Sequence, residues 1–206
     1  MKKFLVWFKS AAPLLVAGAL LAGVVTGSNL LAGNKVEAVP GAGHADYFLK
    51  IDSIAGDSTD AQHPGEIELN SYAWSKEGTP GLEQSGVTGG GGGGAGKVQL
   101  HDIFFSENVS KASPQLMMAT ASGKHFKEAV LSVRKAGKSQ QQFMVIKLSD
   151  IMISSYRTTG QDQSLPTDEF SLSFGRVEFS YMPQKADGSL DTPVVGSWDF
   201  QENKSL

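Results

Sequence analysis

A glycine-rich segment of the chain has the spacing of a phosphate-binding loop. Gly91 to Lys97 reads G-x-x-x-x-G-K, a pattern in which backbone N–H groups and the lysine surround a phosphate. The next residue is Val98, however, where that motif needs a serine or threonine to hold magnesium. The residues that follow indicate a strand, whereas the motif requires a helix. Because a run of glycines matches any glycine motif, we do not expect a nucleotide site here.

A second segment has the spacing of a serine acylation site. Ser132 to Lys135 reads S-x-x-K, but the S-D-N and K-T-G companions of that chemistry are missing from the sequence. The segment lies in a predicted strand whose outer face carries Glu128, Ser132 and Arg134. We therefore predict an exposed strand face and no nucleophile.

The histidines do not form a known catalytic or metal-binding pattern. His44, His63, His101 and His125 include no H-E-x-x-H motif and no pair four residues apart. His101 precedes Asp102, but neighbouring strand residues point to opposite faces and cannot readily pair. The chain has no cysteine, which excludes disulfides and thiolate sites. The sequence predicts no enzymatic activity, no metal site and no cofactor.

Composition allows one folded domain with a proper hydrophobic core. The chain has 206 residues, of which 40% are hydrophobic. Four of its 18 basic residues and one of its 21 acidic residues precede Asp46, so the remainder carries a formal charge of −6. An acidic body without a basic stripe is a poor match for a phosphate backbone, so we exclude nucleic acid as a partner.

Residues 1–45 are predicted to be an export segment with a short linker. Three lysines within the first nine residues precede an uncharged apolar run, and small-residue cleavage sites follow at 36–38 and 43–45. Alternatively, the uncharged residues 11–33 are long enough to span a bilayer as an uncleaved anchor. Both alternatives place the rest of the chain beyond the cytoplasmic membrane.

From Asp46 onward, apolar and polar residues alternate with a period of two, which is typical of β-strands. The predicted strands are residues 47–51, 67–74, 98–105 with an irregularity at 101–102, 129–133, 143–153, 170–181 and 194–200. The apolar face of the 143–153 strand changes midway. In the 170–181 strand the apolar positions change phase at Gly175-Arg176, as they do at a β-bulge. Bulges bend strands, and bent strands help a barrel to close.

One short helix and several turns complete the predicted elements. Ser113 can cap the helix, Pro114 suits its first position, and Gly123 ends it after about two turns. Asp187-Gly188 predicts a tight hairpin turn before the last strand. Strands at regular spacing with a single helix argue for a closed, or nearly closed, all-β barrel in residues 46–206.

Residues 75–96 interrupt the strand pattern. They include Pro80, Gly81 and six consecutive glycines, Gly89 to Gly94. Such a composition cannot keep a fixed structure unaided, so we predict a mobile loop between the second and third strands.

A set of short segments, in order along the chain, carries a family signature. They are YFLKID at 47–52, KASP at 111–114, ASGKH at 121–125, KEA at 127–129, VRKAG at 133–137, PQKADGS at 183–189 and WD at 198–199. The set resembles the hemolysin-coregulated protein (Hcp) family, the tube protein of bacterial type VI secretion.

The resemblance implies a two-sheet antiparallel β-barrel flanked by one short α-helix. It also implies assembly into a six-membered ring with a central channel, and stacking of rings into a tube. The implied partners are further copies of the chain, a spike protein and small effectors in the lumen. Members of the family generally have no enzymatic activity of their own.

The sequence departs from the family pattern in two places. Tube subunits are loaded in the cytoplasm and normally lack a leader such as residues 1–45, and loop 75–96 is extended by glycines. We therefore expect a secreted or envelope-bound relative that assembles into rings or tubes. The alternatives are a conventional tube subunit with a misassigned N-terminus, and a ligand-binding module on the same barrel.

Ring contacts are expected in the second strand and in the segment after the helix. Tyr72 and Trp74 lie opposite the apolar face of their strand, where exposed aromatic residues would anchor a neighbour. Alternatively, both pack inside the barrel. The other candidates carry mixed charge at the start of the fourth strand: Lys124, His125, Lys127 and Glu128.

Overall fold

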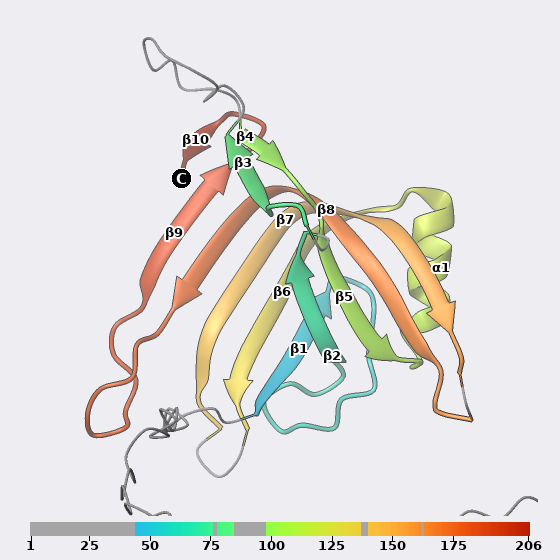
Figure 1. Ribbon diagram of the computed structural model, residues 1–206, viewed down its shortest axis with the longest axis horizontal. Helices are drawn as coiled ribbons and strands as arrows, with labels where there is room; N and C mark the ends of the chain where they lie inside the picture. The colour runs from blue at the N-terminus through green and yellow to red at the C-terminus, as the bar shows by residue number, and fades with distance from the viewer. Residues whose placement is uncertain (1–43, 76–77, 85–97, 137–139, 162) are drawn as a thin grey trace, which may run out of the picture. The chain divides into compact units, whose positions relative to one another are not determined.

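The computed structural model describes residues 44–75, 78–84, 98–136, 140–161 and 163–206. The predicted leader therefore lies outside the described residues, except for its last two positions. The elements are β1 (Ala45–Ile51), β2 (Ile67–Trp74), β3 (Leu82–Gln84), β4 (Val98–Leu100), β5 (Ile103–Asn108), α1 (Ser113–Ser122), β6 (His125–Lys135), β7 (Gln142–Thr159), β8 (Thr167–Tyr181), β9 (Val194–Asp199) and β10 (Lys204–Ser205) (Figure 1).

Six strands close into a barrel. They follow the order β8, β5, β2, β1, β6 and β7, and β7 pairs with β8 to complete the ring of strands. The inward positions hold fully buried leucines, among them Leu49, Leu131, Leu148 and Leu172. Burial of one such side chain contributes about 1.5–3 kcal/mol, so the alternating pattern fixes which face of each strand turns inward. The predicted all-β barrel with one helix is confirmed.

The strand β8 changes its second neighbour halfway along its length. It pairs with β5 as far as Leu172 and with β9 from Arg176 onward, while β7 accompanies it throughout. Figure 1 shows β7 and β8 as long strands that bend over the top of the view, with β9 beside the descending part of β8. The sheet therefore continues past the barrel into β9 and β10.

The predicted phase change at Gly175-Arg176 is present, but it is not a bulge in β8 alone. Ser149 pairs with Arg176 and Ile151 pairs with Phe174, so the register is the same on both sides of this level. The strand β7 changes phase here too, because its buried positions are even-numbered up to 148 and odd-numbered from 151. Both strands shift together and keep their pairing.

Asp150 and Gly175 lie at the level of this paired shift. Asp150 has a φ of 57°, a left-handed conformation that Asp tolerates better than most residues. A Cβ on Gly175 would lie 3.2 Å from Asp150 Oδ2 and 2.8 Å from Gln201 Nε2, so these two side chains pack closely over the glycine. The register shift between β7 and β8 lies instead between Ile153 and Ser155.

The helix α1 begins one residue earlier than predicted, at Ser113 rather than at Pro114. Ala112 is the N-cap, and the Ser113 hydroxyl does not cap the helix but accepts the N–H of Ser110 at 2.9 Å. Pro114 lies in the first turn as predicted, and Gly123 ends the helix with a φ of 63°. The helix has 10 residues rather than about two turns, and it packs against β7.

Residues 75 and 78–84 of the predicted loop 75–96 are among the described residues. They include β3, which pairs with β4 in a separate two-stranded sheet, with Leu82 opposite Leu100. The predicted irregularity at 101–102 is the break between β4 and β5, which belong to different sheets. The polyglycine run Gly89 to Gly94 lies outside the described residues.

Candidate functional site

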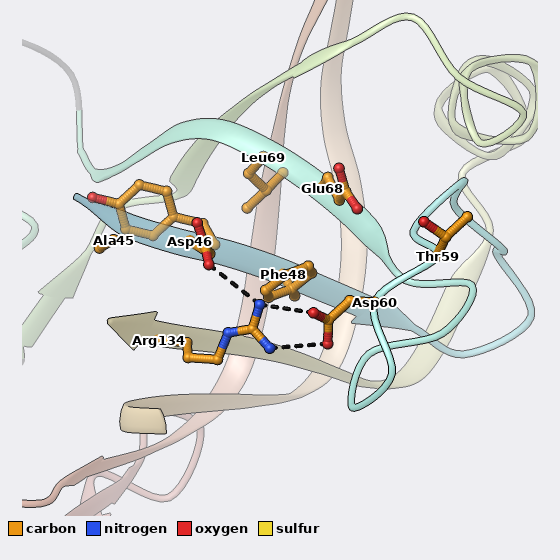
Figure 2. Close-up of a pocket in the computed structure, with 9 residues that line it drawn as sticks. Ala45, Asp46, Phe48, Thr59, Asp60, Glu68, Leu69 and Arg134 are labelled. Carbon is orange, nitrogen blue, oxygen red and sulfur yellow. Dashed lines mark hydrogen bonds and ion pairs between the residues drawn. The ribbon is translucent and has the colours of Figure 1, made fainter. Parts of the chain in front are cut away.

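Residues 52–66, which we call the covering segment, fold over the outer face of β1 and β6. They bury residues that alternation alone would leave in water: Ser132 is 4% exposed and Arg134 is 2% exposed. The prediction of an exposed face at the S-x-x-K segment is therefore wrong for these two side chains. A depression of about 360 Å³ remains beside Arg134, and Figure 2 shows the residues that line it.

Arg134 fastens the covering segment to the barrel. Its Nη1 and Nη2 donate to Asp60 Oδ1 and Oδ2 at 2.9 and 2.8 Å, a two-pronged contact that fits the planar guanidinium. Nη2 also donates to Asp46 Oδ2 of β1 at 3.2 Å (Figure 2). Its Cζ lies 4.9 Å from the centre of the Phe48 ring, within cation–π range.

The Asp60 carboxylate is strongly stabilised as an anion. The Arg134 side-chain hydrogen bonds, followed by the backbone N–H of Gln62, lower the pKa of Asp60 from 3.8 to about 2, although burial acts in the opposite direction. The His63 N–H donates to the same carboxylate at 3.2 Å. The covering segment thus turns several of its own N–H groups toward the residue that binds Arg134.

A stacked pair of rings extends this contact toward the far end of the covering segment. The Phe48 and His63 rings are 4.3 Å apart and nearly parallel, with 7° between their planes. His63 Nδ1 lies 2.9 Å from Glu66 Oε2, which fixes the ring orientation. Both aromatic side chains are buried, so the segment adds a small outer core to the barrel.

These contacts hold the covering segment against the barrel. The charge of Arg134 is balanced by Asp46 and Asp60, which leaves no free cation for an anionic substrate. No group of three or more metal-ligating side chains occurs among the described residues. Asp102, predicted not to pair with His101, instead accepts the hydroxyl of Ser154 at 2.6 Å.

The structure places Tyr72 and Trp74 partly inside the barrel, so the expected exposed anchors are not on its outer surface. A register shift in β2 between Leu69 and Ser71 reverses the faces of the strand, which turns the even-numbered residues inward. Tyr72 and Trp74 are half-buried against the core, and Trp74 Nε1 donates to the backbone oxygen of His101 at 3.1 Å. The alternative reading, packing inside the barrel, describes these two side chains.

The charged candidates lie together at the start of β6, apart from Tyr72 and Trp74. Lys124, His125 and Lys127 are exposed and Glu128 is half-buried. Lys124 Nζ lies 4.8 Å from the centre of the Phe126 ring, and His125 Nδ1 lies 3.9 Å from Asp150 Oδ1. Their part in subunit contacts stays a prediction.

An open, apolar strand pair was missed by sequence reasoning. We call it the β8–β9 ribbon: the paired segments 177–181 and 194–198. Phe179 and Tyr181 are 36% and 45% exposed although they continue the inward face of β8, and Val194, opposite Tyr181, is 65% exposed. They are uncovered because β5 no longer accompanies β8 at this level. The consecutive valines 194–195 are the one sequence signal that could have drawn attention to it.

The ribbon also ends in an open strand edge. In the part of the chain that the structure describes, the outer edge of β9 pairs with β10 at Trp198 and Asp199 alone. Residues 194–197 carry no charge. Uncharged, unpaired edges are surfaces on which further strands or neighbouring chains can pack.

The described residues define a class of protein: a closed β-barrel with a buried polar cluster around Arg134 and an exposed apolar strand pair. The family model described as "Type VI secretion system effector, Hcp" matches residues 48–181. Over 161 residues the chain is 40% identical to "Protein hcp1" of Pseudomonas aeruginosa, an alignment that covers 77% of this chain and 96% of the relative.

Solved structures agree with this match. Hcp1 from Salmonella typhimurium has a TM-score of 0.64 at 29% identity, covering 79% of this chain and 99% of that chain. A chain described as a type six secretion system protein has a TM-score of 0.71 at 24% identity, covering 79% of this chain and 100% of that chain, which supports the fold. The chain belongs to the Hcp family of the type VI secretion system, as the sequence resemblance predicts.

Helices offer no membrane-spanning candidate within the described ranges, where none is both long and apolar enough to cross a bilayer.

Proposed function

We propose that this chain is a non-enzymatic subunit that assembles with copies of itself into rings, six-membered as in its family, and that these rings act beyond the cytoplasmic membrane. The observation that carries the proposal is the β8–β9 ribbon. It combines exposed Phe179, Tyr181 and Val194 with an open strand edge, on a barrel that is otherwise closed. Stacked tubes, a spike protein and small effectors in the lumen are the partners that the family suggests.

A ring requires two different surfaces on each subunit, because its contacts run head to tail. The ribbon supplies an apolar surface that water covers poorly. The charged group Lys124, His125, Lys127 and Glu128 is our candidate for polar contacts at the rim of an interface, where rim charges mainly set specificity and association rate.

We expect the chain from His44 onward, which contains all the described elements, to have a mass in light scattering of about six subunits. Val194→Lys should convert it to monomer, because an ammonium group would lose its water inside the interface without a partner. Val109→Lys is the matched control, since Val109 is also exposed (45%) but lies away from the ribbon, in the connection between β5 and α1. Both variants should keep their melting temperatures within a few degrees.

Two results would count against this proposal. A strict monomer at high concentration would remove the ring. Intact assembly of the Val194→Lys variant would keep the ring but remove the ribbon from its contacts.

Export is tested separately. A C-terminal alkaline phosphatase fusion to the full chain should be active, and removal of residues 1–43 should abolish the activity, because the lysine-flanked apolar run directs the chain outward. N-terminal sequencing of the exported protein then distinguishes a cleaved leader from an anchor formed by residues 11–33.

A second candidate function is favoured by the family match. A conventional tube subunit, loaded with effectors in the cytoplasm, is what the 40% identity to a Pseudomonas aeruginosa Hcp relative would suggest. An inactive phosphatase fusion with the protein in the cytosol would favour this candidate. The ring test above does not discriminate between the two.

A further inference from the structure

Two acidic side chains are buried side by side at the end of the barrel that leads into α1. Glu107 of β5 and Asp168 of β8 are 1% and 0% exposed, and they are directly opposite each other in the strand register. The same row continues to Leu69 of β2 on one side and to Thr158 of β7 on the other. Two carboxyl groups therefore occupy inward positions that apolar side chains hold elsewhere in these strands.

Hydroxyl groups, not cations, surround the two carboxyls. Ser110 Oγ donates to Glu107 Oε2 at 3.1 Å, and Thr158 Oγ1 donates to Asp168 Oδ1 at 2.7 Å. The Tyr156 hydroxyl lies 2.9 Å from Thr158 Oγ1. Within the described structure the remaining oxygens, Glu107 Oε1 and Asp168 Oδ2, are buried without a hydrogen-bond partner. Such a pair is unfavourable as two anions, because neither desolvation nor repulsion is compensated.

Among the described residues, the charged groups near this pair do not supply a free positive charge. Asp57 of the covering segment adds a further negative charge, and Lys111 is exposed and paired with it at 3.5 Å. Arg157 of β7 is 66% exposed and paired with Glu169 on the outward face of the strands. The strand β2 contributes Leu69 to this row, and the sequence of α1 contains no titratable residue.

These surroundings favour the protonated form of Glu107. The pKa of Glu107 rises from 4.5 to about 7, and burial is the largest cause. The hydrogen bond from Ser110 lowers this pKa, whereas the negative charges of Asp168 and Asp57 raise it further. Burial also raises the pKa of Tyr156, which stays neutral and keeps its hydroxyl.

We propose that Glu107 carries a proton in the folded protein, where it lies opposite the buried Asp168, and that this protonated side chain fastens β5 to the start of α1. The connection to the helix runs through Ser110. Its hydroxyl, bonded to Glu107, accepts the N–H of Ala112 at 3.1 Å, and its own N–H donates to Ser113 Oγ at 2.9 Å. The loss of the proton leaves two buried anions beside the first turn of the helix and weakens this end of the barrel.

The direction of the pH effect follows from the raised proton affinity in the folded state. The stabilisation is fully present below about pH 4.5 and is lost as the pH rises through about 7. From this single pair, the unfolding equilibrium constant is expected to increase about 100-fold between pH 5 and pH 8.

The test compares guanidinium unfolding of the chain from His44 onward with that of its Glu107→Gln variant, at pH 5, 6, 7 and 8. Glutamine keeps the shape of the side chain and cannot ionise, so the 100-fold pH effect should disappear and the variant should be the more stable protein at pH 8. The control is Glu169→Gln on β8, whose carboxyl is 52% exposed and lies outside the ribbon, so it should leave the pH effect intact. An equal pH dependence in wild type and Glu107→Gln would overturn the proposal.

A second measurement needs no variant. Carbon-13 NMR of the wild-type side-chain carboxyls should show one resonance that titrates near neutral pH, with hydrogen exchange at the Ser113 and Leu116 amides accelerating over the same range. The proposal is overturned if every carboxyl titrates below pH 5.5. It is equally overturned if Mg²⁺ or Ca²⁺ raises the melting temperature of wild type at pH 8 but not that of Glu107→Gln, since the pair would then be a cation site.

Discussion

Replacing Arg134 with methionine is expected to release the covering segment from the barrel and to lower the melting temperature by about 10 °C. Arg134 is 2% exposed, and its removal leaves Asp60 and Asp46 as neighbouring carboxylates without their cation. Breaking a buried pair from one side is strongly destabilising because the remaining charge is uncompensated. Differential scanning calorimetry measures the shift, and limited proteolysis within residues 52–66 shows that the segment has come loose.

Arg157→Met is the matched control. Arg157 is also paired with a carboxylate, but its side chain is 66% exposed, and exposed pairs contribute little to stability. Its melting temperature should change by no more than about 2 °C. In the double variant Arg134→Met with Asp60→Asn, part of the lost melting temperature should return, because one carboxylate without a partner is removed. Equal effects of Arg134→Met and Arg157→Met would show that the buried contact does not hold the segment.

The same contact predicts sensitivity to acid. The pKa of Asp60 is lowered to about 2 by the bond from Arg134, so its contribution is complete above about pH 3.8 and is lost as the pH falls toward 2. Glu107 acts in the opposite direction at higher pH. The two carboxyls together place the most stable range of the barrel at mildly acidic pH.

The strands could be predicted from the sequence because their signal is local. In β1, Leu49 and Ile51 lie on either side of Lys50, and in β6, Leu131 and Val133 lie on either side of Ser132, so burial of the face that carries the apolar residues follows from a period of two. The family resemblance extended this prediction to the barrel, since its short motifs occur within β1 and β6 and at both ends of α1. The glycine at 175 marked the level at which β8 changes phase.

The covering segment could not be predicted because its contacts are not local. Asp60 and Arg134 are 74 residues apart, and no local pattern indicates that the outer face of β6 is covered. Alternation correctly identified which residues share the outer face, but not that a second layer buries it. That is why Arg134 and Ser132 were expected in water.

The faces of β2 were misassigned for a related reason. The register shift between Leu69 and Ser71 reverses the alternation, and no glycine or proline marks it. In β8, Phe179 and Tyr181 have the same pattern as the buried residues before them, but their exposure depends on the neighbouring strand. Local sequence specifies the face of a strand, whereas the partner that covers this face is a property of the topology.

Replacing Gly56 with alanine is expected to destabilise the protein by about 2–4 kcal/mol. A Cβ at this position would lie 2.2 Å from the carbonyl oxygen of Glu66 and 2.4 Å from the backbone nitrogen of Ile67, so the backbone itself must move. The movement would break the bonds that close the covering segment on itself, in which Gly56 N–H donates to Gly65 O at 2.8 Å and Ser58 N–H donates to Glu66 O at 3.1 Å. Guanidinium unfolding measures the loss.

Gly160→Ala separates this clash from the general effect of removing a glycine. Nothing lies within 4 Å of a Cβ at Gly160, so this variant should stay within about 0.5 kcal/mol of wild type. Gly56→Ala and Arg134→Met loosen the same segment, so their combined effect should be smaller than the sum of the two. Full additivity, or a Gly56→Ala variant as stable as Gly160→Ala, would mean that the covering segment does not fold onto the barrel as one unit. A combined loss well below the sum would show that one local unfolding step, release of residues 52–66, accounts for both substitutions.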